Sequence, residues 1–319
     1  MHTFLTPEPI TLEIRNASGN IQIVLSDTAT TTVDIAAGTS HPLGFLDDVM
    51  SALGVGRAGG RGVRRFEAMV RGRSFGHRGD LFGEHPETDS DDVPVDFVPA
   101  DVTDLVRVEH RAGENPTVIV DTDPARDGWR ASFQITVTAP VGTNVRVHSQ
   151  SSDVTTTGQA QLLDVRTASG DVKLDEVKGK ALLQTASGDV TLAVAGAEVD
   201  IRTASGNVSV GPVGGDALIH TTSGDIQLGA VGGNINARSV SGDVRVGDAV
   251  SGQAEVSAVS GDVEIGVHAG SLASINLSTV SGTTDTDFTV SGDAPDGDAP
   301  VLEITVKTTS GDIRLRRAA

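Results

Sequence analysis

The sequence predicts an all-β protein: a parallel two-sheet β-solenoid of about 18-residue coils, with an N-terminal β cap and a partly helical or disordered insertion. Three observations predict this fold. A Ser-Gly-Asp or Ser-Gly-Asn tripeptide recurs every 18 residues through the middle of the chain. Apolar residues occupy every second position on both sides of it, and glycines recur at a second point of each repeat. Such a period indicates stacked supersecondary units.

The tripeptide supplies the turn between the two strands of a coil. Copies begin at Ser169, Ser187, Ser205, Ser223, Ser241, Ser260 and Ser310, with a Ser-Gly-Thr variant at Ser281 and an isolated earlier copy at Ser18. Glycine reaches positive φ without steric cost, and Asp or Asn accepts backbone N–H bonds, so we predict a structural role for these residues. The turn residues are Gly170, Asp171, Gly188, Asp189, Gly206, Asn207, Gly224, Asp225, Gly242, Asp243, Gly261 and Asp262.

The strands on both sides of the turn alternate between apolar and polar residues. In one coil, Ala181, Leu183 and Thr185 precede the turn, and Val190 and Leu192 follow it. This period of two predicts that these columns point inward between two parallel sheets. The outward columns are polar and mixed, for example Arg166, Gln184, Arg202, His220 and Arg238. We therefore expect a solvated outer surface without a binding groove.

The coil pattern divides the chain into four segments. Residues 1–39 and 105–146 contain short alternating strands and are expected to form the two parts of the N-terminal β cap. The solenoid repeats occupy 147–317. Within them, 285–300 is expected to be a loop between coils, and Val301–Leu315 the final coil, closed by Arg314, Arg316 and Arg317.

Residues 40–104 interrupt the β pattern. Leu43, Leu46, Met50 and Leu53 follow helical spacing and predict one short amphipathic helix. An arginine-rich loop follows, which predicts either a solvated segment or contact with an anionic membrane surface or acidic partner. Its arginines are Arg57, Arg61, Arg64, Arg65, Arg71, Arg73 and Arg78.

The stretches TPEPITLEIRNASGNIQI and FQITVTAPVGTNVRV, together with the TASGDV repeats, resemble a bacterial family of β-strand-repeat proteins. Its members are labelled "putative adhesin" and otherwise form a domain of unknown function; the resemblance covers about residues 1–36 and 105–317. It implies a non-enzymatic β-solenoid, linked in some relatives to the cell envelope and its stress responses. We therefore expect a scaffold or interaction protein with an unknown protein or envelope partner.

Composition excludes several other functions. The net charge of −19 argues against nucleic-acid binding, because phosphate recognition needs a basic face. Cysteine is absent, and Ser and Asp recur in every coil, whereas an active site is singular. We therefore expect no enzyme, no catalytic residues, no cofactor and no metal site. The start of the chain lacks a secretory signal, and no run is long enough for a transmembrane helix, so the expected location is cytoplasmic, with envelope association as the alternative.

The turn aspartates leave one further alternative open, a calcium-stabilised repeat. They should stack at one corner about 4.8 Å apart, where bare carboxylates repel one another. Either calcium or backbone N–H groups within each turn could offset this repulsion. One aspartate per corner supplies too few ligands for calcium, so the sequence favours hydrogen-bonded turns.

Overall fold

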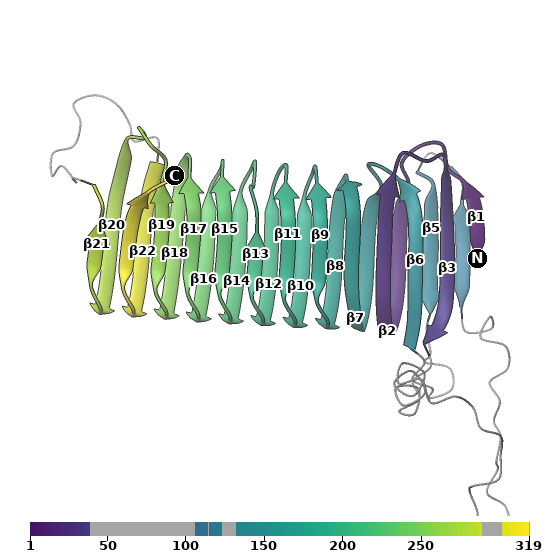
Figure 1. Cartoon of the computed structure of the whole chain (residues 1–319), viewed down its shortest axis with the longest axis horizontal. Coiled ribbons are helices and arrows are strands. Elements are labelled where there is room, and N and C mark those ends of the chain that lie inside the picture. Colours follow the sequence, from purple (N-terminus) through teal and green to yellow (C-terminus); the bar gives the residue numbers. More distant parts are fainter. Residues whose placement is uncertain (39–105, 114, 123–131, 289–301, 319) are drawn as a thin grey trace, which may run out of the picture. The chain divides into compact units, whose positions relative to one another are not determined.

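The computed structural model describes residues 1–38, 106–113, 115–122, 132–288 and 302–318. Within these ranges the chain forms strands and no helix. The strands build two sheets that share one hydrophobic core, and each coil contributes one strand to each sheet (Figure 1). The all-β solenoid predicted from the sequence is therefore confirmed. The helix predicted near Leu43 lies outside the described residues, as does the rest of 40–104.

The first sheet contains the strand that precedes the Ser-Gly-Asp turn of each coil. In spatial order its strands are β4 (Arg107–Arg111), β5 (Thr117–Thr122), the first part of β2 (Thr11–Ser26), the first part of β7 (Asn144–Ala160), β8 (Leu162–Ser169), β10 (Ala181–Ser187), β12 (Val199–Ser205), β14 (Ala217–Ser223), β16 (Ile235–Ser241), β18 (Gly252–Ser260), β22 (Leu302–Ser310) and β20 (Ala273–Ser281).

The second sheet contains the strand that follows the turn. In spatial order its strands are β1 (His2–Leu5), β3 (Thr30–Gly38), β6 (Ser132–Pro140), the second parts of β2 and β7, β9 (Val172–Val177), β11 (Val190–Ala195), β13 (Val208–Val210), β15 (Ile226–Val231), β17 (Val244–Ala249), β19 (Val263–Val267), β23 (Ile313–Arg317) and β21 (Thr284–Thr286).

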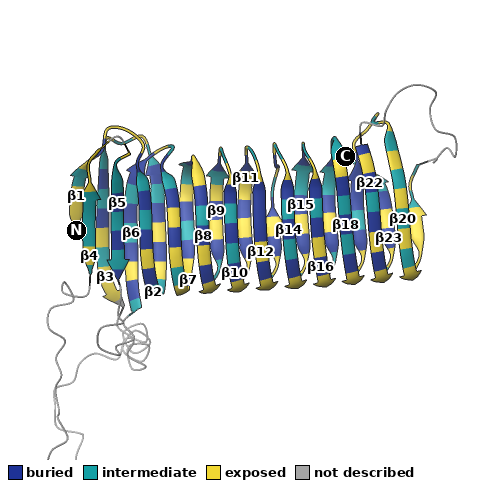
Figure 2. Cartoon of the chain, turned by 180° about the vertical axis from the view of Figure 1, so that it is seen from behind, coloured by how far each residue is buried: buried dark blue, intermediate teal, exposed yellow. Residues whose placement is uncertain are grey.

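The core runs between the two sheets along the stack. Burial alternates along most of the length of the strands, as Figure 2 shows by its bands of dark blue and yellow. Leu183 and Leu192 are each 1% exposed, and they come from opposite sides of the same turn. The inward columns predicted from the period of two are therefore confirmed.

The turn between the sheets requires glycine for two reasons. Gly206 has a φ of +126°, which L side chains rarely adopt. A Cβ at this position would lie 2.1 Å from the carbonyl oxygen of Gly188 in the preceding coil. Beside the turn, the buried Thr185 donates its hydroxyl to the carbonyl oxygen of Ser187 at 3.0 Å. The corner is thus closed by backbone geometry and by a local side-chain bond.

The N-terminal segment enters the stack as a coil of its own. Strand β2 pairs in parallel with β5 and β6 on one side and with β7 on the other (Figure 1). Coils of the two sheets therefore include residues 11–26, 117–122 and 132–140, which the sequence had placed in a separate cap. Among the described strands, the antiparallel pairings are β1 with β3, β3 with β6 and β4 with β5, all at this end of the stack.

The C-terminal segment also enters the stack between two earlier coils. Strands β22 and β23 lie between β18–β19 and β20–β21, so residues 302–317 are not the final coil that the sequence order predicted. The register places Arg314 between Glu264 and Asp285, and Arg314 Nε lies 3.8 Å from Asp285 Oδ2. Arg314 therefore separates two acidic residues that would otherwise be neighbours, which favours the inserted order.

Candidate functional site

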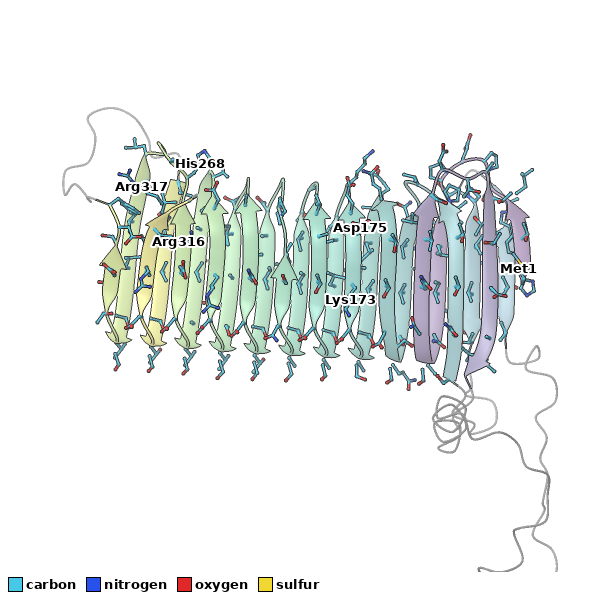
Figure 3. The ribbon with its side chains drawn as sticks, viewed as in Figure 1. Met1, Lys173, Asp175, His268, Arg316 and Arg317 are labelled. Carbon is cyan, nitrogen blue, oxygen red and sulfur yellow. The ribbon has the colours of Figure 1, made fainter. Side chains whose placement is uncertain are left out.

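The aspartates of the Ser-Gly-Asp turns form a continuous hydrogen-bonded ladder, here called the aspartate corner. Figure 3 shows side chains in a regular row along this edge of the stack. In each step, the backbone N–H of one turn residue donates to the side-chain Oδ1 of the equivalent residue in the neighbouring coil. The donor–acceptor pairs are Asp171–Asp153 at 2.9 Å, Asp189–Asp171 at 3.0 Å, Asn207–Asp189 at 2.8 Å, Asp225–Asn207 at 3.0 Å, Asp243–Asp225 at 2.9 Å, Asp262–Asp243 at 3.0 Å, Asp312–Asp262 at 2.8 Å and Thr283–Asp312 at 2.7 Å.

The ladder differs from the sequence expectation in one respect: each carboxylate accepts its bond from the next coil and not from its own turn. The reason is that parallel stacking presents the N–H of each turn to the coil beside it. Oδ1 of each ladder carboxylate is already bonded, and Oδ2 of Asp243 accepts a bond from Arg245. At most one unbonded carboxylate oxygen per coil therefore remains for any cation, well short of the six or more that calcium takes. Among the described residues, no group of three or more His, Asp or Glu side chains converges on a metal position.

The other candidate site is a shallow groove on the outer face of the first sheet. It has a volume of about 610 Å³ and runs across β7, β8, β10 and β12. The groove exists because the column beside the turn carries small side chains, Ala168 and Ala186, next to a column of long polar ones. Its lining comprises His148, Ser149, Arg166, Thr167, Ala168, Gln184, Thr185, Ala186, Arg202 and Thr203.

The long polar column that borders the groove is here called the arginine row. In spatial order it contains Arg15, His148, Arg166, Gln184, Arg202, His220 and Arg238, one residue per coil. Arginine occupies every second coil, and His or Gln occupies the coils between. The insertion of β2 brings Arg15 into this series, although it lies more than a hundred residues before the next member.

Four ion pairs lie on this face among the strands from β2 to β18. Arg166 contacts Asp164 at 3.1 Å and Arg202 contacts Asp200 at 3.2 Å. The remaining two are Arg146–Glu13 at 3.2 Å and Arg238–Glu255 at 3.7 Å. The partner carboxylates occupy the outward column farther from the turn, so none of them lines the groove of 610 Å³. Surface pairs of this kind add little stability, so their regular placement needs another reason.

The comparison with known families decides the identity of the fold. The family described as Toastrack DUF4097 matches residues 130–214 and 183–316, which together make up more than half of the chain. The chain belongs to the Toastrack DUF4097 family. The resemblance expected from the TASGDV repeats is thereby confirmed.

Two solved structures are similar to this Toastrack chain. One is described as "a putative adhesin" from Bacteroides fragilis, with 13% identity, a TM-score of 0.40, and coverage of 98% of this chain and 95% of that one. The other is "a putative cell adhesion protein" from Clostridium sporogenes, with 7% identity, a TM-score of 0.25, and coverage of 99% and 98%. The curated proteins contain no match.

Other predicted features of this Toastrack chain contribute less to the site. The seven arginines of the insertion, Arg57 to Arg78, lie outside the described residues. His148 and His220 share the arginine row but are separated by intervening coils, as the sequence predicted.

At the C-terminal end, His268 Nδ1 lies 2.8 Å from Asp248 Oδ2, near Arg316 and Arg317 in Figure 3. The ranges described contain no helix of sufficient length and apolar character to span a membrane.

The sequence did not predict the groove. Its outward column of Arg166, Gln184 and Arg202 was interpreted as a solvated surface without a binding groove. Two signals could have indicated it: alanine at the position before several serines, and arginine three residues before every second serine. Both have meaning only once neighbouring coils are aligned, because each signal is spread over several repeats.

Proposed function

We infer that this Toastrack protein is a non-enzymatic, adhesin-like scaffold that binds an envelope-associated partner through the outer face of its first sheet. The observation that carries the proposal is the groove bordered by Arg166 and Arg202, whose lining contains cationic side chains and no carboxylate. The two similar structures are described as a putative adhesin and a putative cell adhesion protein, which supports a binding role.

The same face supports binding better than catalysis. Its lining contains hydroxyl, guanidinium and imidazole groups, but Thr167, Thr185 and Thr203 are buried and donate to backbone carbonyl oxygens. They are therefore not positioned as nucleophiles, and the face lacks a base-activated hydroxyl. Rows of similar groups repeated from coil to coil suit an extended ligand more than a single reacting bond.

Site-specific photo-crosslinking in the native bacterium tests this proposal. A photo-reactive residue replaces Gln184 in the groove or, as the matched control, Gln227 on the outer face of the second sheet. We expect adducts from position 184 in the envelope fraction and few from position 227. Adducts confined to the cytoplasmic fraction, or equal at both positions, would contradict the proposal. Release of products from a polysaccharide by the purified protein would overturn its non-enzymatic part.

The insertion supports a second candidate function, peripheral binding to an anionic membrane surface or acidic partner. Its seven arginines fall within 22 residues, next to a segment with an apolar helical spacing. Deletion of 41–104 should abolish binding to vesicles of anionic phospholipid, and high salt should weaken that binding in the intact chain. Vesicle binding that survives the deletion would exclude the insertion as the binding segment.

A further inference from the structure

We propose that the groove on the first sheet binds a linear acidic polysaccharide, laid across the coils with its uronate carboxylates on the arginine row. The inference rests on the proposed function, because it names the chemical class of the partner that this face would bind. It goes beyond that function by specifying charge, polymer type and repeat length.

The first argument is charge. The chain carries a net charge of −19, yet the groove is lined by His148, Arg166 and Arg202 and by no carboxylate of the described residues. A second hollow of about 230 Å³ extends this face toward β2 and adds Arg15 and Arg146, together with the carboxylates Glu13 and Asp164. Arg166 and Arg202 each also bond a carboxylate of their own strand, Asp164 and Asp200. Because a guanidinium carries five N–H donors, a uronate would bind the donors that these pairs leave free.

The second argument is the period of the row. The core repeats with every coil, because each coil must fill the same inward columns. The outer face repeats with every second coil: Arg15, Arg166, Arg202 and Arg238 alternate with His or Gln. Arginines in alternate coils are about 9.6 Å apart, twice the strand spacing. Extended polysaccharides with a charged sugar in each disaccharide present their carboxylates at a comparable interval.

The third argument separates a polysaccharide from other polyanions. An acidic peptide that docks on a sheet needs unpaired backbone groups, but β8, β10 and β12 each pair on both sides. Single-stranded nucleic acids are held largely by stacking on aromatic side chains, and the groove lining has no Phe or Trp. An acidic polysaccharide needs neither feature, since its carboxylates and hydroxyls can be bound by side chains alone.

The test measures binding of the full chain to a hyaluronan oligosaccharide, which carries one glucuronate carboxylate per disaccharide, by isothermal titration calorimetry. Neutral dextran and poly-glutamate serve as comparison probes. We expect the hyaluronan oligosaccharide to bind, binding to weaken as salt rises, and the two comparison probes to bind at least tenfold more weakly. Poly-glutamate binding as tight as hyaluronan binding would overturn the choice of a polysaccharide. Lack of hyaluronan binding at millimolar concentration would overturn the inference as a whole.

Two variants locate the site and test the period. The double variant Arg166→Gln with Arg202→Gln should weaken binding at least tenfold. The control is Lys173→Gln with Arg245→Gln, which removes the same charge from the second sheet; Lys173 is labelled in Figure 3. This control should change the affinity less than twofold. Gln184→Arg with Arg202→Gln keeps the net charge but places arginines in adjacent coils. It should also weaken binding at least tenfold. Thermal melts check that every variant is folded at the temperature of titration.

The outcomes distinguish this inference from the proposed function. Equal losses from the two glutamine pairs would indicate non-specific attraction and overturn the site. An unchanged affinity in the charge-conserving variant would overturn the role of the two-coil period. If crosslinks from position 184 persist in the envelope fraction while the hyaluronan oligosaccharide fails to bind, the scaffold function stands and the polysaccharide inference falls.

Discussion

In the coils from β8 to β17, each strand pairs with the strands one repeat before and after it in the sequence, whereas at both ends of the stack a distant segment is inserted between two coils. The inward columns and turns are nearly the same in both regions. The repeat therefore specifies the conformation of each coil, but it does not specify which coil pairs with which. Side chains outside the repeat must decide the order at the ends.

At the C-terminal end, charged side chains favour one order of the coils. Arg314 stands between Glu264 and Asp285, and Arg316 contacts Glu264, so the inserted coil supplies cations to acidic neighbours. The ladder gives a second signal. The last coil in space carries Thr283 where the others carry Asp or Asn, so its N–H completes the ladder but it offers no carboxylate to a further coil.

The largest effect should follow removal of residues 302–319, which breaks this arrangement. In the described chain, β20 and β21 pair only with the deleted strands, and the deletion exposes the core that Ile304 and Leu315 cover. Each fully buried aliphatic side chain is worth about 1.5–3 kcal/mol. Hydrogen exchange should show residues 273–286 losing nearly all protection, while 181–231 keep theirs.

The matched control for this truncation removes residues 1–5 at the opposite end. Strand β1 is an edge strand with no buried residue, so its loss should leave the protection of β6 unchanged. Retained protection of 273–286 after the C-terminal truncation would mean that β20 pairs directly with β18. In that case Arg314 would not be needed to order the coils.

A smaller effect compares one substitution in the two regions. Leu192 in β11 is 1% exposed, so Leu192→Ala should lower the free energy of unfolding by about 2–5 kcal/mol. Leu277 in the outermost coil is only partly buried, so Leu277→Ala should cost about 1 kcal/mol or less. Chemical denaturation of both variants measures the contrast; equal costs would show that the outermost coil is as well packed as the centre.

These two regions also differ in how far the sequence predicts them. The columns of Leu183 and Leu192 and the turn glycines such as Gly206 followed from local periodicity, because strand alternation and positive φ are properties of neighbouring residues. The insertion of β2 and of β22–β23 did not follow, because pairing between distant segments leaves no trace in an 18-residue period. The arginine row was hidden for the same reason: Arg15 joins it only through the fold.

Substitutions at the aspartate corner in the central coils should change the free energy of unfolding less than Leu192→Ala does. Asn207 occupies the same ladder position as its charged neighbours, so Asp189→Asn should change stability by less than about 0.5 kcal/mol. Asp189→Ala removes the acceptor of the Asn207 N–H and should cost about 1 kcal/mol. Thermal melts of the wild type with millimolar calcium and with chelator should coincide; a midpoint raised by calcium would contradict the hydrogen-bonded ladder.

The smallest effect concerns the ladder at the C-terminal end. The backbone N–H of Thr283, and then its side chain, with Arg314 nearby, hold the pKa of Asp312 below its ordinary value of 3.8. Because the folded state lowers this pKa, the ionised carboxylate stabilises the outermost coil above about pH 3.8, and that contribution is lost as the pH falls through the lowered value. The amide signal of Thr283 in NMR should therefore titrate with an inflection below 3.8. Asp312→Asn keeps an acceptor without a titrating group, as Asn207 does in the centre, and should remove the inflection. An inflection at or above the ordinary value would show that the Thr283 bond does not favour the ionised form, and that the ladder ends one coil earlier.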